Sequence, residues 1–227
     1  MVLPKSGRQL WTAVDEYFRA LLAPGDKYLE AAVKANRKAG LPAIDVSPLQ
    51  GQHLNILVRM TRPKRVLEIG TLGGYSTICM ARALPVGGRI VTLESSPRHA
   101  EVARKNLKHA GVLDRVDLRM GPALHILPIL ESEGAGPFDF VFIDADKQSN
   151  AEYVKWALRL SRPGTTIVVD NVVRDGKVID GKSKDPDIVG TRRMAELIAK
   201  EPRLSATMVQ TVGAKGYDGF LLAVVVQ

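Results

Sequence analysis

The sequence has only one cysteine, Cys79, among 227 residues, so no disulfide can form within the chain. Chains without disulfides are typical of reducing compartments, and we expect a cytoplasmic protein. No run of about 18 or more uncharged apolar residues is present, and 220–226 has only the length of a strand, so no transmembrane helix is predicted. Charged residues interrupt 11–22, where a signal peptide would have an apolar core. No membrane partner is therefore expected.

Aromatic residues are also scarce, at 5% of the chain, although the net charge is strongly positive. Lys and Arg exceed Asp and Glu by 32 − 24 = 8, and the isoelectric point is near 9.7. A basic protein can bind nucleic acid, but base stacking needs aromatic side chains, and here the basic residues are spread along the sequence. We therefore expect a solvated basic surface and no nucleic-acid partner.

After residue 64 the sequence alternates regularly between apolar runs and helical patterns. The runs predict strands at 66–69, 89–93, 116–119, 138–143 and 165–169, and the intervening stretches predict helices at 76–84, 97–110, 123–130 and 151–160. Such alternation gives right-handed crossovers and a mainly parallel sheet with helices on both faces. A last helix at 188–200 precedes strands at 205–209 and 219–225, which a short connection, 213–218, should pair antiparallel.

Helical spacing also marks the residues before this alternation. The segment 7–39 predicts two helices broken at Pro24-Gly25, and Ser47 is placed to cap a third helix at 48–60, with Pro48 at its first position. No repeat or linker divides the chain. The sequence thus predicts a single domain, 1–227, with N-terminal helices in 1–60 and an α/β core in 61–227.

The segment RVLEIGTLGGYS (65–76) is an apolar strand that passes through glycines into a helix. At such turns the backbone can approach a ligand closely, because glycine has no side chain. Glu94 ends the next strand, 24 residues after Gly70, close to the ~20-residue offset of a carboxylate that binds ribose hydroxyls. The pattern fits S-adenosylmethionine (SAM) and also NAD, so a nicotinamide-dependent oxidoreductase is an alternative, although no Tyr/Lys relay or catalytic His supports it.

Further polar residues follow the fourth and fifth predicted strands. Asp144 and Asp146 lie in FIDADK (142–147), and Asp170 and Asn171 end VVDN (168–171). Adjacent parallel strands would bring Asp144, Asp170 and Asn171 to one edge of the sheet. Two carboxylates and an amide form a set of hard oxygen donors that suits Mg²⁺, Ca²⁺ or Mn²⁺. The sequence therefore predicts a divalent-cation site beside the glycine-rich turn.

Six segments together carry a resemblance to a known family: SPLQGQHLNILVR (47–59), RVLEIGTLGGYS (65–76), ARKNLKHAGV (103–112), GPAL (121–124), FDFVFIDADK (138–147) and VVDN (168–171). With them the chain resembles the cation-dependent, SAM-dependent O-methyltransferases that include catechol and caffeoyl-CoA O-methyltransferases. The pairing of FIDADK with DN is the most specific feature. The resemblance, which covers most of 40–171, implies a Rossmann-like class I methyltransferase fold with a seven-stranded, mostly parallel sheet. It also implies a homodimer formed through the N-terminal helices.

The resemblance implies a SAM site made of residues from several loops: Val46, Glu68, Gly70, Thr71, Ser76, Glu94, Ala123 and Asp144. In this site Glu68 and the turn would hold the methionine and ribose part of the cofactor, and Ser76 would bond its carboxylate. Glu94 would bind the ribose, and Ala123 would lie beside adenine.

The metal ligands implied by the resemblance are Asp144, Asp170 and Asn171, and Lys147 lies where the family has its general base. Lys147 and Asp144 would thus be the catalytic residues. The implied reaction transfers a methyl group from SAM to a hydroxyl of a metal-chelated, catechol-type phenol. Two bound ligands would align nucleophile, methyl carbon and leaving sulfur for an in-line displacement.

After Asn171 the sequence departs from the plant caffeoyl-CoA pattern, which continues with a tryptophan and an asparagine. Here Val173, Arg174 and Asp175 occupy the stretch, which favours a small phenol over a CoA ester. The polar segment 172–187 is predicted to form a mobile loop over the substrate. Alternatives are a methyltransferase that acts on a caffeoyl-CoA-like ester or on RNA, and a SAM-binding module without turnover.

Overall fold

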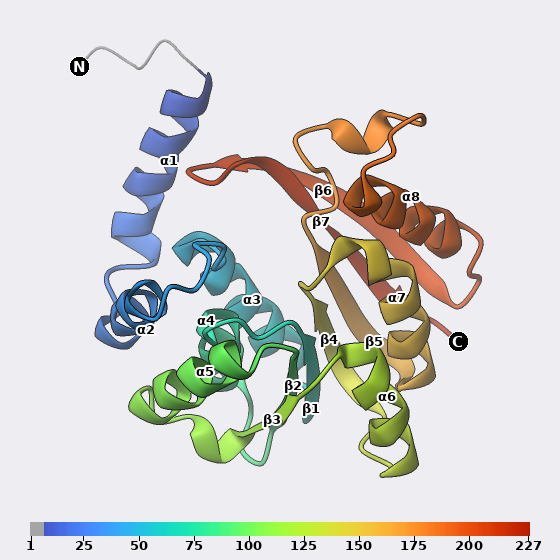
Figure 1. Ribbon diagram of the computed structural model, residues 1–227, viewed down its shortest axis with the longest axis horizontal. Helices are drawn as coiled ribbons and strands as arrows, with labels where there is room; N and C mark the ends of the chain where they lie inside the picture. Colours follow the sequence, from blue (N-terminus) through green and yellow to red (C-terminus); the bar gives the residue numbers. More distant parts are fainter. Residues whose placement is uncertain (1–6) are drawn as a thin grey trace.

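A computed structural model describes residues 7–227, which form one seven-stranded sheet with helices on both faces (Figure 1). The strands are β1 (Arg65–Ile69), β2 (Arg89–Glu94), β3 (Val116–Met120), β4 (Phe138–Ile143), β5 (Ser161–Asp170), β6 (Leu204–Gly213) and β7 (Gly216–Val225). The helices are α1 (Gly7–Leu22), α2 (Lys27–Lys38), α3 (Pro48–Thr61), α4 (Tyr75–Ala83), α5 (Pro97–His109), α6 (Ala123–Ser132), α7 (Asn150–Arg159) and α8 (Pro186–Ala199). Three 3₁₀ turns are η1 (Leu113–Arg115), η2 (Lys147–Ser149) and η3 (Lys177–Ile179).

The strands follow the order β3-β2-β1-β4-β5-β7-β6 across the sheet. β1 to β5 pair in parallel, whereas β7 pairs antiparallel with both β5 and β6. β1 therefore has β2 on one side and β4 on the other, and the connections leave it in opposite directions. Ligands bind at the carboxyl ends of strands at this kind of reversal.

Gly70 allows the loops after β1 and β4 to meet at this reversal. Its backbone has φ +99°, and its N–H donates to Leu93 O at 3.0 Å. A Cβ atom at Gly70 would lie 2.1 Å from Asp144 O, inside the contact distance of any side chain. Only glycine fits here, because both the left-handed conformation and the close approach exclude a Cβ.

The core lies on both faces of the sheet, because successive side chains of a strand point in opposite directions. Leu67 and Ile69 pack into the apolar layer under α6, α7 and α8. Val66 and Phe140 pack into the layer under α3, α4 and α5. The predicted α/β core and its parallel strands are confirmed.

Two predicted boundaries are wrong in the C-terminal part of the sheet. The connection predicted at 213–218 is a tight turn of two residues, Ala214 and Lys215, because β6 and β7 remain paired as far as Gly213 and Gly216. β6 is an edge strand whose side chains are mostly exposed, so its apolar pattern does not reveal its length. β5 also starts at Ser161 instead of 165, since pairing with β4 continues past Pro163-Gly164 through a register shift.

The N-terminal helices are present as predicted, and Ser47 caps α3 by accepting a hydrogen bond from Gln50 N. α1 extends away from the sheet and meets the tip of the β6–β7 hairpin, where Ala214 N donates to Asp15 Oδ2 at 2.8 Å (Figure 1). Within 7–227, no helix has both the length and the apolar character needed to cross a membrane.

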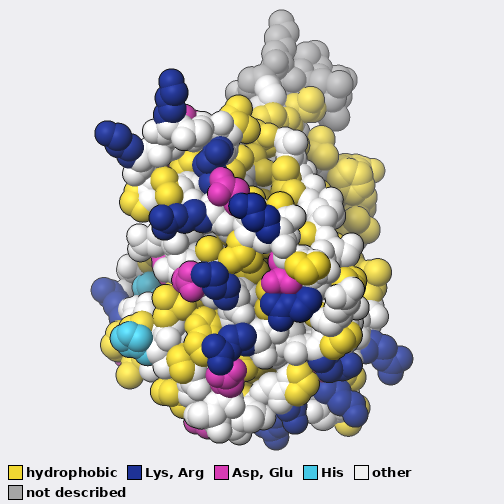
Figure 2. Space-filling model, turned by 90° about the vertical axis from the view of Figure 1, so that its right-hand side faces the viewer, with side chains coloured by type: hydrophobic (Ala, Val, Ile, Leu, Met, Phe, Trp, Pro, Cys, Tyr) yellow, Lys and Arg dark blue, Asp and Glu magenta, His cyan; other side chains and the backbone are white. Residues whose placement is uncertain are grey.

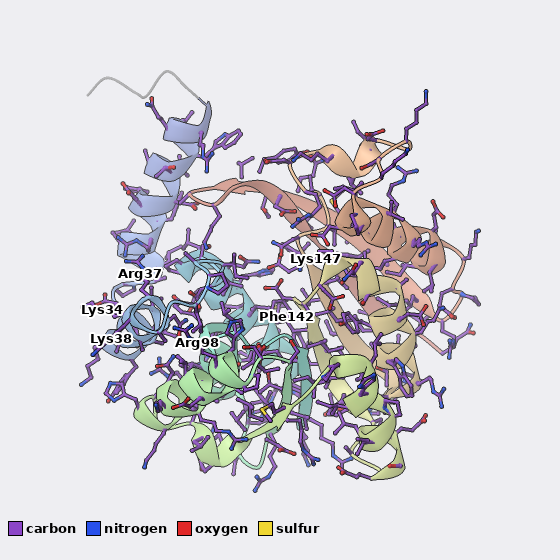
Figure 3. The ribbon with its side chains drawn as sticks, in the orientation of Figure 1. Lys34, Arg37, Lys38, Arg98, Phe142 and Lys147 are labelled. Carbon is purple, nitrogen blue, oxygen red and sulfur yellow. The ribbon has the colours of Figure 1, made fainter. Side chains whose placement is uncertain are left out.

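Basic and acidic side chains alternate over the face that α7 and α8 present, with hydrophobic groups between them (Figure 2). A small basic cluster exists elsewhere. Lys34, Arg37 and Lys38 lie at the C-terminal half of α2, with Arg98 of α5 nearby and Lys147 well away from them (Figure 3). Because acidic side chains lie between the basic ones, the face shown in Figure 2 has no continuous basic groove.

Candidate active site

A cavity of about 730 Å³ opens at the carboxyl ends of the parallel strands. Its lining contains nine of the eleven predicted cofactor-binding, metal-binding and catalytic residues: Val46, Gly70, Thr71, Ser76, Glu94, Ala123, Asp144, Lys147 and Asn171. Glu68 and Asp170 are not in the lining, because both are almost completely buried behind it. The fold thus brings segments from 46 to 171 around one space.

Glu94 fixes the glycine-rich turn to the start of α5. Its Oε2 accepts a hydrogen bond from Leu72 N at 2.8 Å, and its Oε1 accepts one from Ser96 N at 2.9 Å. His99 Nδ1 lies 3.4 Å from the same Oε1. The carboxylate is therefore held at the edge of the cavity with lone pairs left for a ligand.

Glu68 supports the turn from behind. It is fully buried, and its carboxylate accepts hydrogen bonds from the hydroxyls of Ser76 at 2.6 Å, Thr77 at 2.5 Å and Thr92 at 2.7 Å. Burial raises the pKa of Glu68 to about 7, although the three hydroxyl donors oppose this shift. The Ser76 hydroxyl, which lines the cavity, has its proton directed at Glu68, away from any ligand.

The alternation of side chains in β1 could have revealed this arrangement. Glu68 shares a face with Val66, which is fully buried under α4, so its side chain points into the protein and not beyond the end of the strand.

Lys147 and Asp144 lie together directly after β4. Lys147 Nζ is 2.7 Å from Asp144 Oδ1, and the lysine is only 6% exposed. Lys147 begins η2, against which α8 packs closely at Gly190. A Cβ atom at Gly190 would lie 2.3 Å from Lys147 O, so this glycine permits the packing that holds the lysine.

Asp170 ends β5 and is 4% exposed. Its carboxylate accepts hydrogen bonds from the Gln50 amide of α3 and from Asn171 N. Burial and, to a smaller degree, the negative charge of Asp144 raise the pKa of Asp170 to about 7, although the positive charge of Lys147 opposes this shift. The two carboxylates therefore share a poorly solvated corner of the site and repel each other.

This corner suits a divalent cation. Asp144, Asp170 and Asn171 supply two carboxylates and an amide, the oxygen donors that Mg²⁺ and Ca²⁺ prefer, and a cation would relieve the repulsion. Asn171 has φ +57°, a conformation that asparagine tolerates better than most residues. Within 7–227, no group of three or more His, Cys, Asp and Glu residues could hold a metal, and this candidate set combines two carboxylates with an amide.

Several residues at this site escaped the sequence analysis. Gln50 is one. Asp218 lies in the predicted connection 213–218, and its contacts were not predicted: its Oδ1 accepts hydrogen bonds from Val173 N and Arg174 N at 3.0 Å and from Gly219 N at 2.9 Å. Asp218 thereby attaches the segment after Asn171 to β7. The predicted loop at 172–187 contains η3, and it borders the cavity through Arg174 and Asp187, whose side chains form an ion pair at 3.1 Å.

The chain is similar in sequence and fold to known methyltransferases. A family model described as O-methyltransferase matches residues 22–224. A catechol O-methyltransferase of Niastella koreensis is 52% identical over 217 residues, which cover 96% of this chain and 98% of that protein.

Among solved structures, an O-methyltransferase from Bacillus cereus in complex with SAH has a TM-score of 0.94 and 58% identity, covering 95% of this chain and 98% of that one. The O-methyltransferase TomG from Streptomyces achromogenes, in complex with SAM, has a TM-score of 0.95 and 48% identity, covering 98% of this chain and 100% of that one. The predicted family, the Rossmann-like fold and the reaction class, methyl transfer to oxygen, are confirmed. The chain belongs to the O-methyltransferase family.

Proposed function

We propose that this protein transfers the methyl group of SAM to one hydroxyl of a catechol-type phenol, as a single-domain cytoplasmic enzyme that requires a divalent cation. The relative from Niastella koreensis is named a catechol O-methyltransferase, and two similar structures hold SAM or SAH. The chain covers nearly the full length of these proteins, which supports the transfer of their reaction to it.

The cofactor would bind in the half of the cavity formed by the glycine-rich turn and α6. Glu94 is held there by two backbone N–H groups and can accept hydrogen bonds from ribose hydroxyls. Thr71 and Ala123 line the same space, and Val46 contributes from the loop before α3. Glu68 keeps the turn in shape through its hydroxyl partners and would act on the cofactor only through that turn.

The phenol would bind in the other half, next to Lys147. A divalent cation held by Asp144, Asp170 and Asn171 would supply positive charge that lowers the pKa of a chelated hydroxyl. Lys147, in its neutral form, would accept the hydroxyl proton at Nζ, and its burial keeps water away from that atom. Asp144 orients Lys147 through their contact at 2.7 Å. The resulting phenolate would face the methyl group held from the opposite half of the cavity.

The observation that carries this proposal is the closeness of Asp144, Asp170 and Lys147 at the end of the sheet, in the same cavity as the glycine-rich turn. The test is methylation of a panel of vicinal diphenols with labelled SAM, with and without EDTA. We expect transfer with Mg²⁺, loss of transfer with EDTA, and recovery when Mg²⁺ is added back. Transfer that persists in EDTA would contradict the cation requirement, and a protein that binds NAD instead of SAM would contradict the proposed function as a whole.

A homodimer is part of the proposal, supported by the exposed apolar surface of α1. None of the residues of α1, all of which are described, is buried, although Leu10, Val14, Phe18 and Leu21 make it amphipathic. Amphipathic helices need a partner for the apolar face. We propose that a second copy of this chain covers the apolar face of α1. Light scattering should then give twice the chain mass of 24.7 kDa, and Leu21→Asp should shift it to the mass of one chain. A wild-type monomer would contradict the dimer.

A further inference from the structure

We propose that Arg174 selects vicinal diphenols that carry a carboxylate substituent, an inference that rests on the function proposed above. Arg174 lines the cavity together with Lys147 and Asn171. Among the described residues, the Lys and Arg side chains of this lining are only Lys147 and Arg174. Lys147 is already paired with Asp144. A negative charge elsewhere on the substrate would therefore meet Arg174.

The backbone of Arg174 is anchored close to the reacting centre. It lies three residues after Asn171, and three residues of chain span at most about 11 Å. Its N–H donates to Asp218 Oδ1, and its carbonyl accepts from Lys177 N, both at 3.0 Å. The residue is held in the left-handed region at φ +57°. The side chain thus starts from a fixed point beside the space where a phenol ring would lie.

The guanidinium of Arg174 has capacity for a second acid. Its single acidic partner in the described chain is Asp187, which one nitrogen, Nη2, contacts at 3.1 Å. A guanidinium carries five N–H groups in a planar fork that matches a carboxylate with two parallel hydrogen bonds. The side chains of this pair are 31% and 40% exposed, so the existing ion pair is weak and open to a ligand.

The opposite preference, for a substrate with an ammonium group, fits the lining less well. Asp187 is neutralised by Arg174, and Asp146 accepts a hydrogen bond from the Tyr153 hydroxyl. Asp144 has Lys147 as its counter-charge. Asp45 and Glu94 also line the cavity; Asp45 accepts from the Asn36 amide, and Glu94 accepts from two backbone N–H groups beside the glycine-rich turn. A carboxylate next to Lys147 can use donors of Arg174 that Asp187 leaves free, whereas an ammonium group there would compete with Lys147 for Asp144 or with Arg174 for Asp187.

The test compares three substrates that differ in one substituent: 3,4-dihydroxybenzoate, 3,4-dihydroxybenzamide and 3,4-dihydroxybenzylamine. Each kcat/KM is measured with Mg²⁺ for the wild type and for Arg174→Gln. We expect the variant to lose about tenfold or more on the benzoate and to stay within about threefold on the benzamide and the amine. Gln is unbranched like Arg, so the strain of the left-handed backbone is unchanged.

Asp187→Asn is the matched control, because it breaks the same ion pair but keeps the guanidinium. It should preserve or increase the benzoate preference. Equal losses on benzoate and benzamide in Arg174→Gln, or a benzoate loss of the same size in Asp187→Asn, would overturn the role of Arg174.

The proposed function and this inference can fail separately. If the wild type methylates none of the three substrates, the proposed function fails. In that case the role of Arg174 is tested by calorimetry, which measures the binding of 3,4-dihydroxybenzoate in the presence of SAH and Mg²⁺. Tighter binding by the wild type than by Arg174→Gln supports the role of Arg174, and equal binding refutes it. If the benzamide is methylated and Arg174→Gln changes nothing, only this inference is wrong.

Discussion

Replacement of Lys147 by methionine is expected to lower kcat by a factor of about 100 to 10,000, the range of a lost general base. Methionine fills a similar apolar space but cannot accept a proton. Because Lys147 is only 6% exposed, solvent is poorly placed to replace it. Binding of SAM should change little, since the glycine-rich turn and Glu94 form the other half of the cavity. Single-turnover measurement of methyl transfer at saturating SAM would give the rate directly.

Lys155 offers a matched control for this variant. It pairs with Glu152 at 2.7 Å with the same three-residue spacing as Lys147 and Asp144, but on the exposed surface of α7. Lys155→Met should therefore leave kcat unchanged, because exposed ion pairs contribute little. A Lys147→Met enzyme that folds, binds SAM and keeps kcat within about threefold of wild type would refute the role of Lys147 as a base.

Most of the fold could be predicted because its causes are local in the sequence. Apolar runs such as that of β4 define buried strands, and Gly70 marks a turn that only glycine can form. The site residues that follow a strand end, Asp144 and Asp170, could be found for the same reason, since a parallel sheet aligns the ends of its strands. The lengths of β5 and β6 could not, because the first residues of β5 and nearly all of the edge strand β6 are exposed and show little apolar pattern.

Contacts that depend on how helices pack over the sheet left no local signal. Gln50 and Asp170 are 120 residues apart, and their hydrogen bond depends on the angle at which α3 crosses the sheet. Gly190 looks like an ordinary helix residue until α8 is seen against the backbone of Lys147. Asp218 belongs to an exposed-looking turn in the sequence, yet it anchors the segment that carries Arg174. Tertiary packing, not sequence spacing, decides these positions.

The raised pKa of Asp170 gives the metal-free protein a defined pH dependence of stability. Its pKa of about 7 lies above the ordinary value of 3.8, because burial and the charge of Asp144 disfavour ionisation. The folded state therefore holds a proton that the unfolded state has released. The contribution of Asp170 to the free energy of unfolding is therefore fully present below pH 4 and is lost as the pH rises through about 7. Above pH 7, where Asp170 has lost its proton, a cation bound by Asp144 and Asp170 would supply the positive charge that the proton supplied at lower pH.

Addition of Mg²⁺ is consequently expected to raise the melting temperature much more at pH 8 than at pH 5. A concentration near 100 times the dissociation constant stabilises the folded state by about 2.7 kcal/mol, or about 5–10 °C for a chain of this size. At pH 5 the Asp170 proton must first be displaced, so the same concentration should give almost no shift. Differential scanning fluorimetry at both pH values, without SAM or phenol, measures this effect independently of turnover.

Asp170→Asn should abolish both the Mg²⁺-induced shift at pH 8 and methyl transfer, and it should leave the metal-free protein at least as stable as wild type at that pH. The reason is that asparagine removes the charge that repels Asp144, which offsets the loss of one of the two acceptors that the Asp170 carboxylate offers to the Gln50 amide and to Asn171 N. Asp146→Asn is the control, because Asp146 lines the same cavity but is held by Tyr153 and lies outside the proposed ligand set. That variant should retain the shift. A shift that survives in Asp170→Asn, or that is missing from wild type at pH 8, would show that the two strand ends do not hold the cation.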